Sequence, residues 1–372
     1  MKKMVALCFL LCFLLSCMTG FAENTGEKEE RPVYTLTLLD AIEMARKDNA
    51  QLMVYDVQEK SAKFGYEVQR ELKKAYKNVV IHATNSMEMA YVKDGYYTEV
   101  FLMQERLAKE GKKKQENVIA YQVTEKYYRC KQAEGLVKVM RDTLAIAEQN
   151  KKTVDAQYAL GLISQMTVTN AEIAVEQSRL SLESYERSLL LAYDNLKIDL
   201  HLDGIDCALV LTDEITCEDY ISDVNKDLEK AMETRYDVKA LMESTAMSKR
   251  YFDITASHSS AEVASYQSAY ADYLSAKNTQ DTSVKQIALG IKSYYNAILT
   301  AKGDLTIAEK TLELKQSEYD AAKLKYEMGM ISNMELTRIM NEVSAQQINV
   351  ENAKATYRLA VEKYQYEIRT GL

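Results

Sequence analysis

The second half of this chain repeats the first half, and the repetition constrains the fold more than any other feature of the sequence. The segment Tyr158–Ser164 reads Tyr-Ala-Leu-Gly-Leu-Ile-Ser, and 168 residues later Tyr326–Ser332 reads Tyr-Glu-Met-Gly-Met-Ile-Ser. Gly135 matches Gly303 at the same spacing. A register held without gaps over a stretch this long indicates two copies of one structural unit.

The register continues beyond the glycine segment, where Glu183 matches Glu351. Near the start of each copy, Ala41–Ala45 resembles Asp227–Ala231 at the larger spacing of 186 residues, so the first copy is longer by 18 residues. A helical hairpin absorbs such an insertion at its tip without disturbing the rest. We expect a first repeat at 36–203, a linker at 204–219 and a second repeat at 220–372.

Proline is absent after Pro32, and glycine occurs only 12 times in 372 residues, so helices can continue without interruption over long distances. Strong helix formers fill these stretches. The predicted fold class is all-α, with two repeated long antiparallel helical hairpin units and little or no β-structure. Each copy is expected to run helix, tip, helix, glycine turn, helix, with the tips near Asp94–Gly95 and Asn278–Asp281.

The two glycine turns are the predicted sharp reversals of each repeat. Gly161 and Gly329 follow apolar helical runs, where a left-handed residue ends a helix. Ser332 and Glu335 then have the spacing of a capping box. The apolar residues beside the turns form either an exposed contact surface or inward-packing caps. The candidate docking residues are Gly161, Leu162, Ile163, Ser164, Gly329, Met330, Ile331 and Ser332.

The N-terminus predicts export. Two lysines precede an apolar run at residues 5–15, and small residues follow at Gly20 and Ala22. This arrangement is typical of a secretory signal peptide at residues 1–22. Two kinds of processing remain open: cleavage after Ala22, or a lipoprotein signal that ends before a lipidated Cys17. In either case the protein is expected in the cell envelope.

Composition excludes several classes of function. Without Lys2 and Lys3 the chain has 45 basic and 55 acidic residues, whereas a nucleic-acid surface needs a basic excess. No nucleotide-binding or catalytic motif is present, so we predict neither an enzyme nor a cofactor. His82, His201 and His258 lack neighbouring ligands at metal-binding spacing, and no metal site is predicted.

Three cysteines follow the signal region. Cys207 and Cys217 are close enough in sequence to close a small loop through a disulfide in an oxidising compartment. The alternative is that both, together with Cys130, are free thiols.

The chain resembles the TolC-like family of outer-membrane efflux and secretion factors. Thr35–Ile42, followed by Ala45 and Asn49, is similar to the opening helix of that family. Val123–Tyr128 is similar to the start of its third helix, and Tyr158–Ser164 to its hairpin turn. The resemblance covers nearly the whole chain after the signal.

The resemblance implies a trimeric tunnel of twelve packed helices, which an adaptor protein joins to an inner-membrane efflux or ABC transporter. The glycine turns would lie at the periplasmic end, where the adaptor docks. The family often has an acidic residue six positions after the glycine, lining the aperture. Glu335 occupies that position in the second copy, and Thr167 occupies it in the first.

Family members insert two membrane strands per repeat at the hairpin tips, and here we expect those strands to be reduced or missing. Met87–Met103 offers at most one short strand hairpin around the turn at Asp94–Gly95, and Ala261–Lys285 offers none.

Two functions follow from these features. The first is an envelope export component, located in the outer membrane or periplasm of a cell with two membranes, or at the surface of a cell with one. The alternative is a coiled-coil scaffold of the envelope without a channel.

Overall fold

A computed structural model describes residues 32–79 and 87–372 of the chain. The predicted signal peptide, with the candidate lipidation site Cys17, lies outside the described residues, and so does His82.

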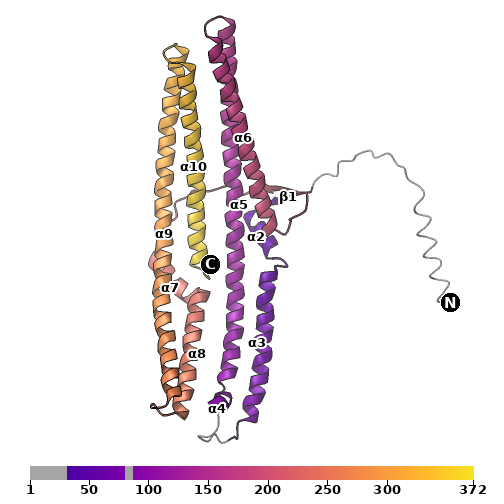
Figure 1. Ribbon diagram of the computed structural model, residues 1–372, viewed down its shortest axis with the longest axis vertical. Coiled ribbons are helices and arrows are strands. Elements are labelled where there is room, and N and C mark those ends of the chain that lie inside the picture. The colour runs from indigo at the N-terminus through magenta and orange to yellow at the C-terminus, as the bar shows by residue number, and fades with distance from the viewer. Residues whose placement is uncertain (1–31, 80–86) are drawn as a thin grey trace, which may run out of the picture.

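The chain folds into a long rod of helices whose two halves repeat each other (Figure 1). The central helix of each half has 64 residues and the helix after it has 35, and both pairs are offset by 168 positions. The register in the sequence is therefore a register of complete helices. The first half contains α2 (Leu38–Arg46), α3 (Ala50–Ala75), α4 (Met87–Asp94), α5 (Tyr96–Ala159) and α6 (Gln165–Asp199); the second contains α7 (Val224–Thr234), α8 (Tyr236–His258), α9 (Ala264–Glu327) and α10 (Asn333–Glu367).

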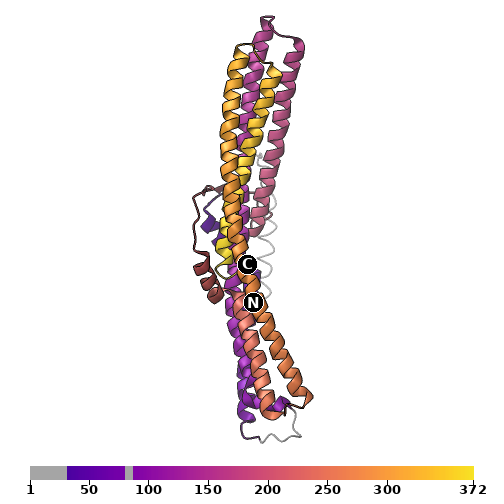
Figure 2. The ribbon, with the colours of Figure 1, turned by 90° about the vertical axis from the view of Figure 1, so that its left-hand side faces the viewer.

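The two 64-residue helices α5 and α9 run the full length of the rod, about 95 Å each at 1.5 Å per residue. In the upper half of Figures 1 and 2, α6 packs against α5 and α10 packs against α9. In the lower half α3 and α8 take those places. The two halves meet where α5 packs against α10 in the upper part, and where α8 packs against α5 and α4 in the lower part. The prediction of long antiparallel helical hairpins is confirmed.

A two-stranded parallel sheet lies at the middle of the rod and joins segments that are far apart in sequence. Strand β1 (Val33–Leu36) pairs in register with β2 (Ala208–Leu211), which lies inside the predicted linker. The Tyr127 hydroxyl of α5 donates to the carbonyl of Leu36 and accepts from the amide of Asp213. This fully buried tyrosine holds the end of β1 and the residues after β2 against α5.

Most of the buried apolar residues gather near the same level. One cluster is formed around Tyr127, Leu196 and Leu200 of the first repeat, and a second around Ile298 and Tyr364 of the second repeat. Helices at the two ends bury far less, because they are thin hairpins. The middle of the rod therefore anchors each half.

The prediction for the second tip was wrong. Asn278–Asp281 lies inside α9, and the chain reverses at residues 259–263 instead. The polar stretch has weak helix propensity, but α9 packs against α8 there: Ala269 is buried, and Thr245 donates to the carbonyl of Ala276. Tertiary packing overrides weak propensity of this kind.

The first tip is only partly as predicted. Gly95 has a left-handed φ of +82°, but it joins two helices, α4 and α5, and not two strands. The strand hairpin considered for Met87–Met103 is therefore wrong, because those residues are helical apart from Gly95.

Candidate functional site

The two glycine turns at the upper end of the rod have the same backbone structure. Gly161 has φ +70° and Gly329 has φ +73°. The amide after each glycine donates to the carbonyl five residues earlier, from Leu162 to Gln157 and from Met330 to Lys325. The glycine amide itself donates three residues back, which completes a Schellman motif. Both glycines therefore occupy the left-handed position that the sequence indicates.

The apolar residues beside the glycines divide into two kinds. Leu162 is 69% exposed and Met330 is 68% exposed, so both side chains lie in solvent at the end of the rod. Ile163 and Ile331 are half-buried, and Ile163 packs against the small cluster around Val154. The side chains of Leu162 and Met330 are open to solvent, whereas Ile163 packs as a cap.

The serines after the turns act as N-caps. Ser164 accepts a hydrogen bond from the amide of Thr167, and Ser332 accepts one from the amide of Glu335. The Glu335 side chain does not complete the predicted capping box. Its carboxylate instead forms a two-pronged ion pair with Arg338, at 2.7 and 3.0 Å. Hydrogen bonding to Arg338 lowers the pKa of Glu335, so the acid is ionised and paired.

Polar contacts join the two turns within one chain. The Tyr326 hydroxyl donates to the Gln157 side chain at 2.9 Å, and Asn333 donates to Asn150 at 2.8 Å. Below them, α5, α9 and α10 enclose a groove of about 360 Å³ whose apolar lining includes Met340. The end of the rod is thus one connected unit.

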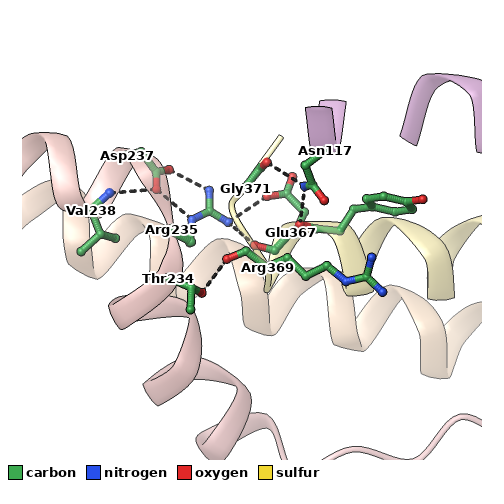
Figure 3. A network of polar contacts seen from close by, with 9 residues as sticks. Asn117, Thr234, Arg235, Asp237, Val238, Glu367, Arg369 and Gly371 are labelled. Carbon is green, nitrogen blue, oxygen red and sulfur yellow. Dashed lines mark hydrogen bonds and ion pairs between the residues drawn. The ribbon is translucent and has the colours of Figure 1, made fainter. Parts of the chain in front are cut away.

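A second polar network lies in the middle of the rod and is absent from the sequence-based predictions. Arg235, between α7 and α8, is 6% exposed and binds both carboxylate oxygens of Asp237. It also donates to the backbone carbonyl and the carboxylate of Glu367 (Figure 3). Asn117 of the first repeat donates to the carbonyl of Gly371 in the same network. The network joins the end of α10 to the start of α8 and to α5 of the first repeat.

Burial and the Arg235 guanidinium act on the pKa of Asp237 in opposite directions. Burial raises it, but the hydrogen bonds and charge of Arg235 outweigh burial and lower the pKa below its usual value. Both members of the pair are therefore charged near neutral pH. The residues of this network form no sequence motif, because they come from three distant segments of the chain.

The three cysteines among the described residues, Cys130, Cys207 and Cys217, are free. Cys207 is buried in the cluster of the first repeat, whereas Cys217 packs beside the cluster of the second. The disulfide considered between them is therefore not formed. Burial raises the pKa of Cys130 to about 12, so that thiol is neutral.

Among residues 32–79 and 87–372, no group of His, Cys, Asp and Glu side chains has the arrangement of a metal site. No helix in these ranges is both long enough and apolar enough to cross a bilayer.

Comparison with solved structures shows what this fold is similar to. A membrane protein from Pseudomonas aeruginosa matches with a TM-score of 0.72 and 14% identity, over 90% of both chains. The outer membrane protein VceC from Vibrio cholerae matches at 0.69 and 12% identity, over 90% of this chain and 96% of that one. The Campylobacter jejuni CmeC outer membrane channel matches at 0.65 and 10% identity, over 89% and 85%.

No protein-family model and no curated protein sequence matches the chain. The similarity is therefore one of fold, and it extends over about 90% of the chain to channels of the TolC family. The resemblance identified from the glycine turns and the repeat is confirmed at that level.

Proposed function

We propose that this protein is a subunit of an oligomeric helical conduit in the cell envelope, which acts with an adaptor protein and an inner-membrane transporter. The observation that carries the proposal is the extent of the fold similarity. The chain matches the solved chains of CmeC, VceC and CusC over 85–96% of their length, so the similarity extends over the whole subunit and not one helical hairpin.

A single chain leaves large apolar side chains exposed along its two outer helices. A lone rod of this thickness cannot cover them, and association of identical copies is the simplest way to remove them from water. We propose a homotrimer, as the resemblance implies. The exposed apolar residues are Ile173, Leu180, Leu190, Leu191 and Ile198 on α6, and Leu289, Leu299, Ile307, Leu314 and Leu324 on α9.

The glycine-turn end is the proposed docking site for the adaptor. Leu162 and Met330 project from equivalent turns in the two repeats, so an oligomer presents them as a ring of apolar patches. The strength of adaptor binding at such patches depends on the apolar area that the contact covers.

Glu335 is the proposed acidic residue at the aperture, with Thr167 at the equivalent position in the first repeat. Because Glu335 is paired with Arg338, the charge that it presents is partly compensated. We therefore expect weak selection against anions at this end.

The test of this function begins with the oligomeric state of the full-length protein and its capture of partners from native envelopes. Leu162→Lys with Met330→Lys is expected to leave the helical content unchanged and to remove the adaptor and transporter from the purified complex. Ile221→Lys is the matched control, because Ile221 is 88% exposed and lies far from the turns, in the segment just before α7.

If the double lysine variant lowers only the melting temperature and keeps its partners, the docking proposal is wrong. A wild-type protein that stays monomeric at high micromolar concentration would contradict the conduit and favour the envelope scaffold.

The proposed export route is tested separately through the N-terminus of the mature protein. Mass spectrometry of the protein from envelopes separates the alternatives, because one leaves Glu23 first and the other leaves a lipidated Cys17. A mature protein that retains Met1 contradicts both.

A further inference from the structure

The junction between the two repeats contains a close contact between a glycine and a glutamate. At Gly135 of α5, the carboxylate of Glu351 from α10 would lie 2.6 Å from an added Cβ atom. Its carbon Cδ would lie 3.3 Å away. Lys354 holds the carboxylate through a 2.9 Å bond. A side chain at position 135 would push the end of the Glu351 side chain aside, so the glycine allows α10 to bring this carboxylate against the backbone of α5.

Both members of this contact recur in the other repeat, but there they do not meet. Gly303 of α9 is the counterpart of Gly135, and Glu183 of α6 is the counterpart of Glu351. A Cβ atom added at Gly303 would have no neighbour within 4 Å. The Glu183 side chain is 51% exposed, and its ion pair with Arg187 is long at 3.7 Å.

An open glycine inside a long helix is unfavourable, since alanine stabilises a helix interior better. No close contact within the described chain explains a glycine at position 303. In Figure 1, α9 and α6 lie at opposite sides of the upper rod, with α10 and α5 between them. The contact that Gly303 would suit is therefore one with a different copy of the chain.

We infer that Gly303 of one copy receives Glu183 of a second copy, so that the junction between chains has the same register as the α5–α10 junction within a chain. This inference rests on the proposed oligomeric conduit and specifies its interface. Such an interface joins two different faces, α9 and α6, so each copy offers one face to each neighbour.

The charges on either side of the contact agree with this register. Within the chain, Glu134 of α5 and Lys354 of α10 line the same cleft as the glycine contact. Their counterparts are Lys302 on α9 and Glu186 on α6, so both signs are exchanged. Within one chain Lys302 pairs with Asp219 and Glu186 pairs with Arg141. A junction between copies in this register would bring charges of opposite sign near each other and so adds no like-charge contact.

An apolar pair lower on the same helices supports the register independently. Within the chain, the rings of Tyr121 and Tyr366 lie 5.6 Å apart. Their counterparts at the same spacing are Leu289, which is 67% exposed, and Ile198, which is 55% exposed. Two exposed aliphatic residues thus take the positions of a packed pair and would cover each other between copies.

Disulfide trapping in cells that express the full-length protein tests the register. Gly303→Cys combined with Glu183→Cys is expected to give dimers and higher species on non-reducing gels, because the side chains would approach within bonding range. Gly135→Cys with Glu351→Cys is the positive control and should cross-link within one chain. Gly290→Cys with Glu183→Cys is the negative control, since Gln122, the counterpart of Gly290, is exposed.

A second measurement tests the effect of a larger side chain at these glycine positions. Gly303→Leu and Gly290→Leu both add a side chain to α9 where the isolated chain has open space. We expect both variants to keep the helical content of the wild type. Only Gly303→Leu should raise the midpoint concentration of oligomer dissociation, by tenfold or more.

The outcomes separate the register from the conduit. If the wild type is oligomeric but the Gly303–Glu183 pair gives only monomers, or if Gly290→Leu dissociates it equally, the register is wrong and the conduit stands. A monomeric wild type overturns both. Intermolecular trapping at Gly303–Glu183 but not at Gly290–Glu183, with selective dissociation of Gly303→Leu, supports the inferred junction.

Discussion

Replacement of Arg235 by methionine tests whether the central polar network stabilises the rod. The substitution removes the guanidinium that binds Glu367 at 2.7 and 2.9 Å and Asp237 at 2.7 and 2.9 Å. Glu367 is 7% exposed, so its charge is left in a site with little water. Breaking a buried ion pair by removing one partner destabilises by about 3–5 kcal/mol, and we expect at least ~3 kcal/mol here.

Asp237 contributes less to this loss, because its side chain is 35% exposed and water can solvate the stranded carboxylate. Adding Glu367→Gln to Arg235→Met removes the buried charge and is expected to recover at least ~1 kcal/mol. Arg106→Met is the matched control. Arg106 also forms a two-pronged pair, with Glu243, but its side chain is 55% exposed, so a loss of about 0–1 kcal/mol is expected.

The assay is urea unfolding followed by circular dichroism, with all variants at one protein concentration because association also stabilises the folded state. The reasoning is refuted if Arg235→Met loses no more stability than Arg106→Met. It is also refuted if the double variant is no more stable than the single one, since the buried charge on Glu367 would then not be the cause.

Three further predictions follow from the same structure. Gly161→Ala and Gly329→Ala should each lower the free energy of unfolding by about 1 kcal/mol. The cause is left-handed backbone strain alone, since an added Cβ meets no neighbour at either site. Gly161→Asn should lose much less stability, and thermal unfolding measures all three variants. The stability difference between wild type and Arg235→Met should shrink as the pH falls below about 4. The folded-state pKa of Asp237 is lowered, so its contribution is present above the unfolded value of 3.8 and is lost as acid protonates the carboxylate, and urea unfolding at several pH values would show a constant difference if this is wrong. Iodoacetamide should modify half-buried Cys217 in the native protein before Cys130 and Cys207, which are buried, and peptide mass spectrometry that finds Cys130 modified first would contradict this order.

The helices and the glycine turns could be predicted because their signals are local. A helix boundary depends on residues within a few positions, as at Gly161, where the glycine, the preceding apolar run and Ser164 all specify one reversal. The 168-residue register could also be predicted from the sequence, since two helices of equal length need equal numbers of residues.

Local signals failed where packing between distant segments decided the outcome. The polar stretch Asn278–Asp281 has the composition of a turn, but α8 supports it as helix. Strands β1 and β2 are four residues each and lie more than 170 positions apart, so neither has a local pattern that distinguishes it. Glu335 has the spacing of a capping box, yet Arg338 one turn later competes for its carboxylate.

The sequence by itself therefore determined that this chain forms two copies of a long helical hairpin with sharp glycine reversals. The tertiary structure decided which contacts each copy of a repeated residue makes. Gly135 and Gly303 are identical in sequence and in position along their helices, but only Gly135 has a glutamate against its backbone. Arg235 likewise becomes a buried junction only because α10 ends beside α8. The physical reason is that a helix depends on neighbours along the chain, whereas burial depends on which faces meet in space.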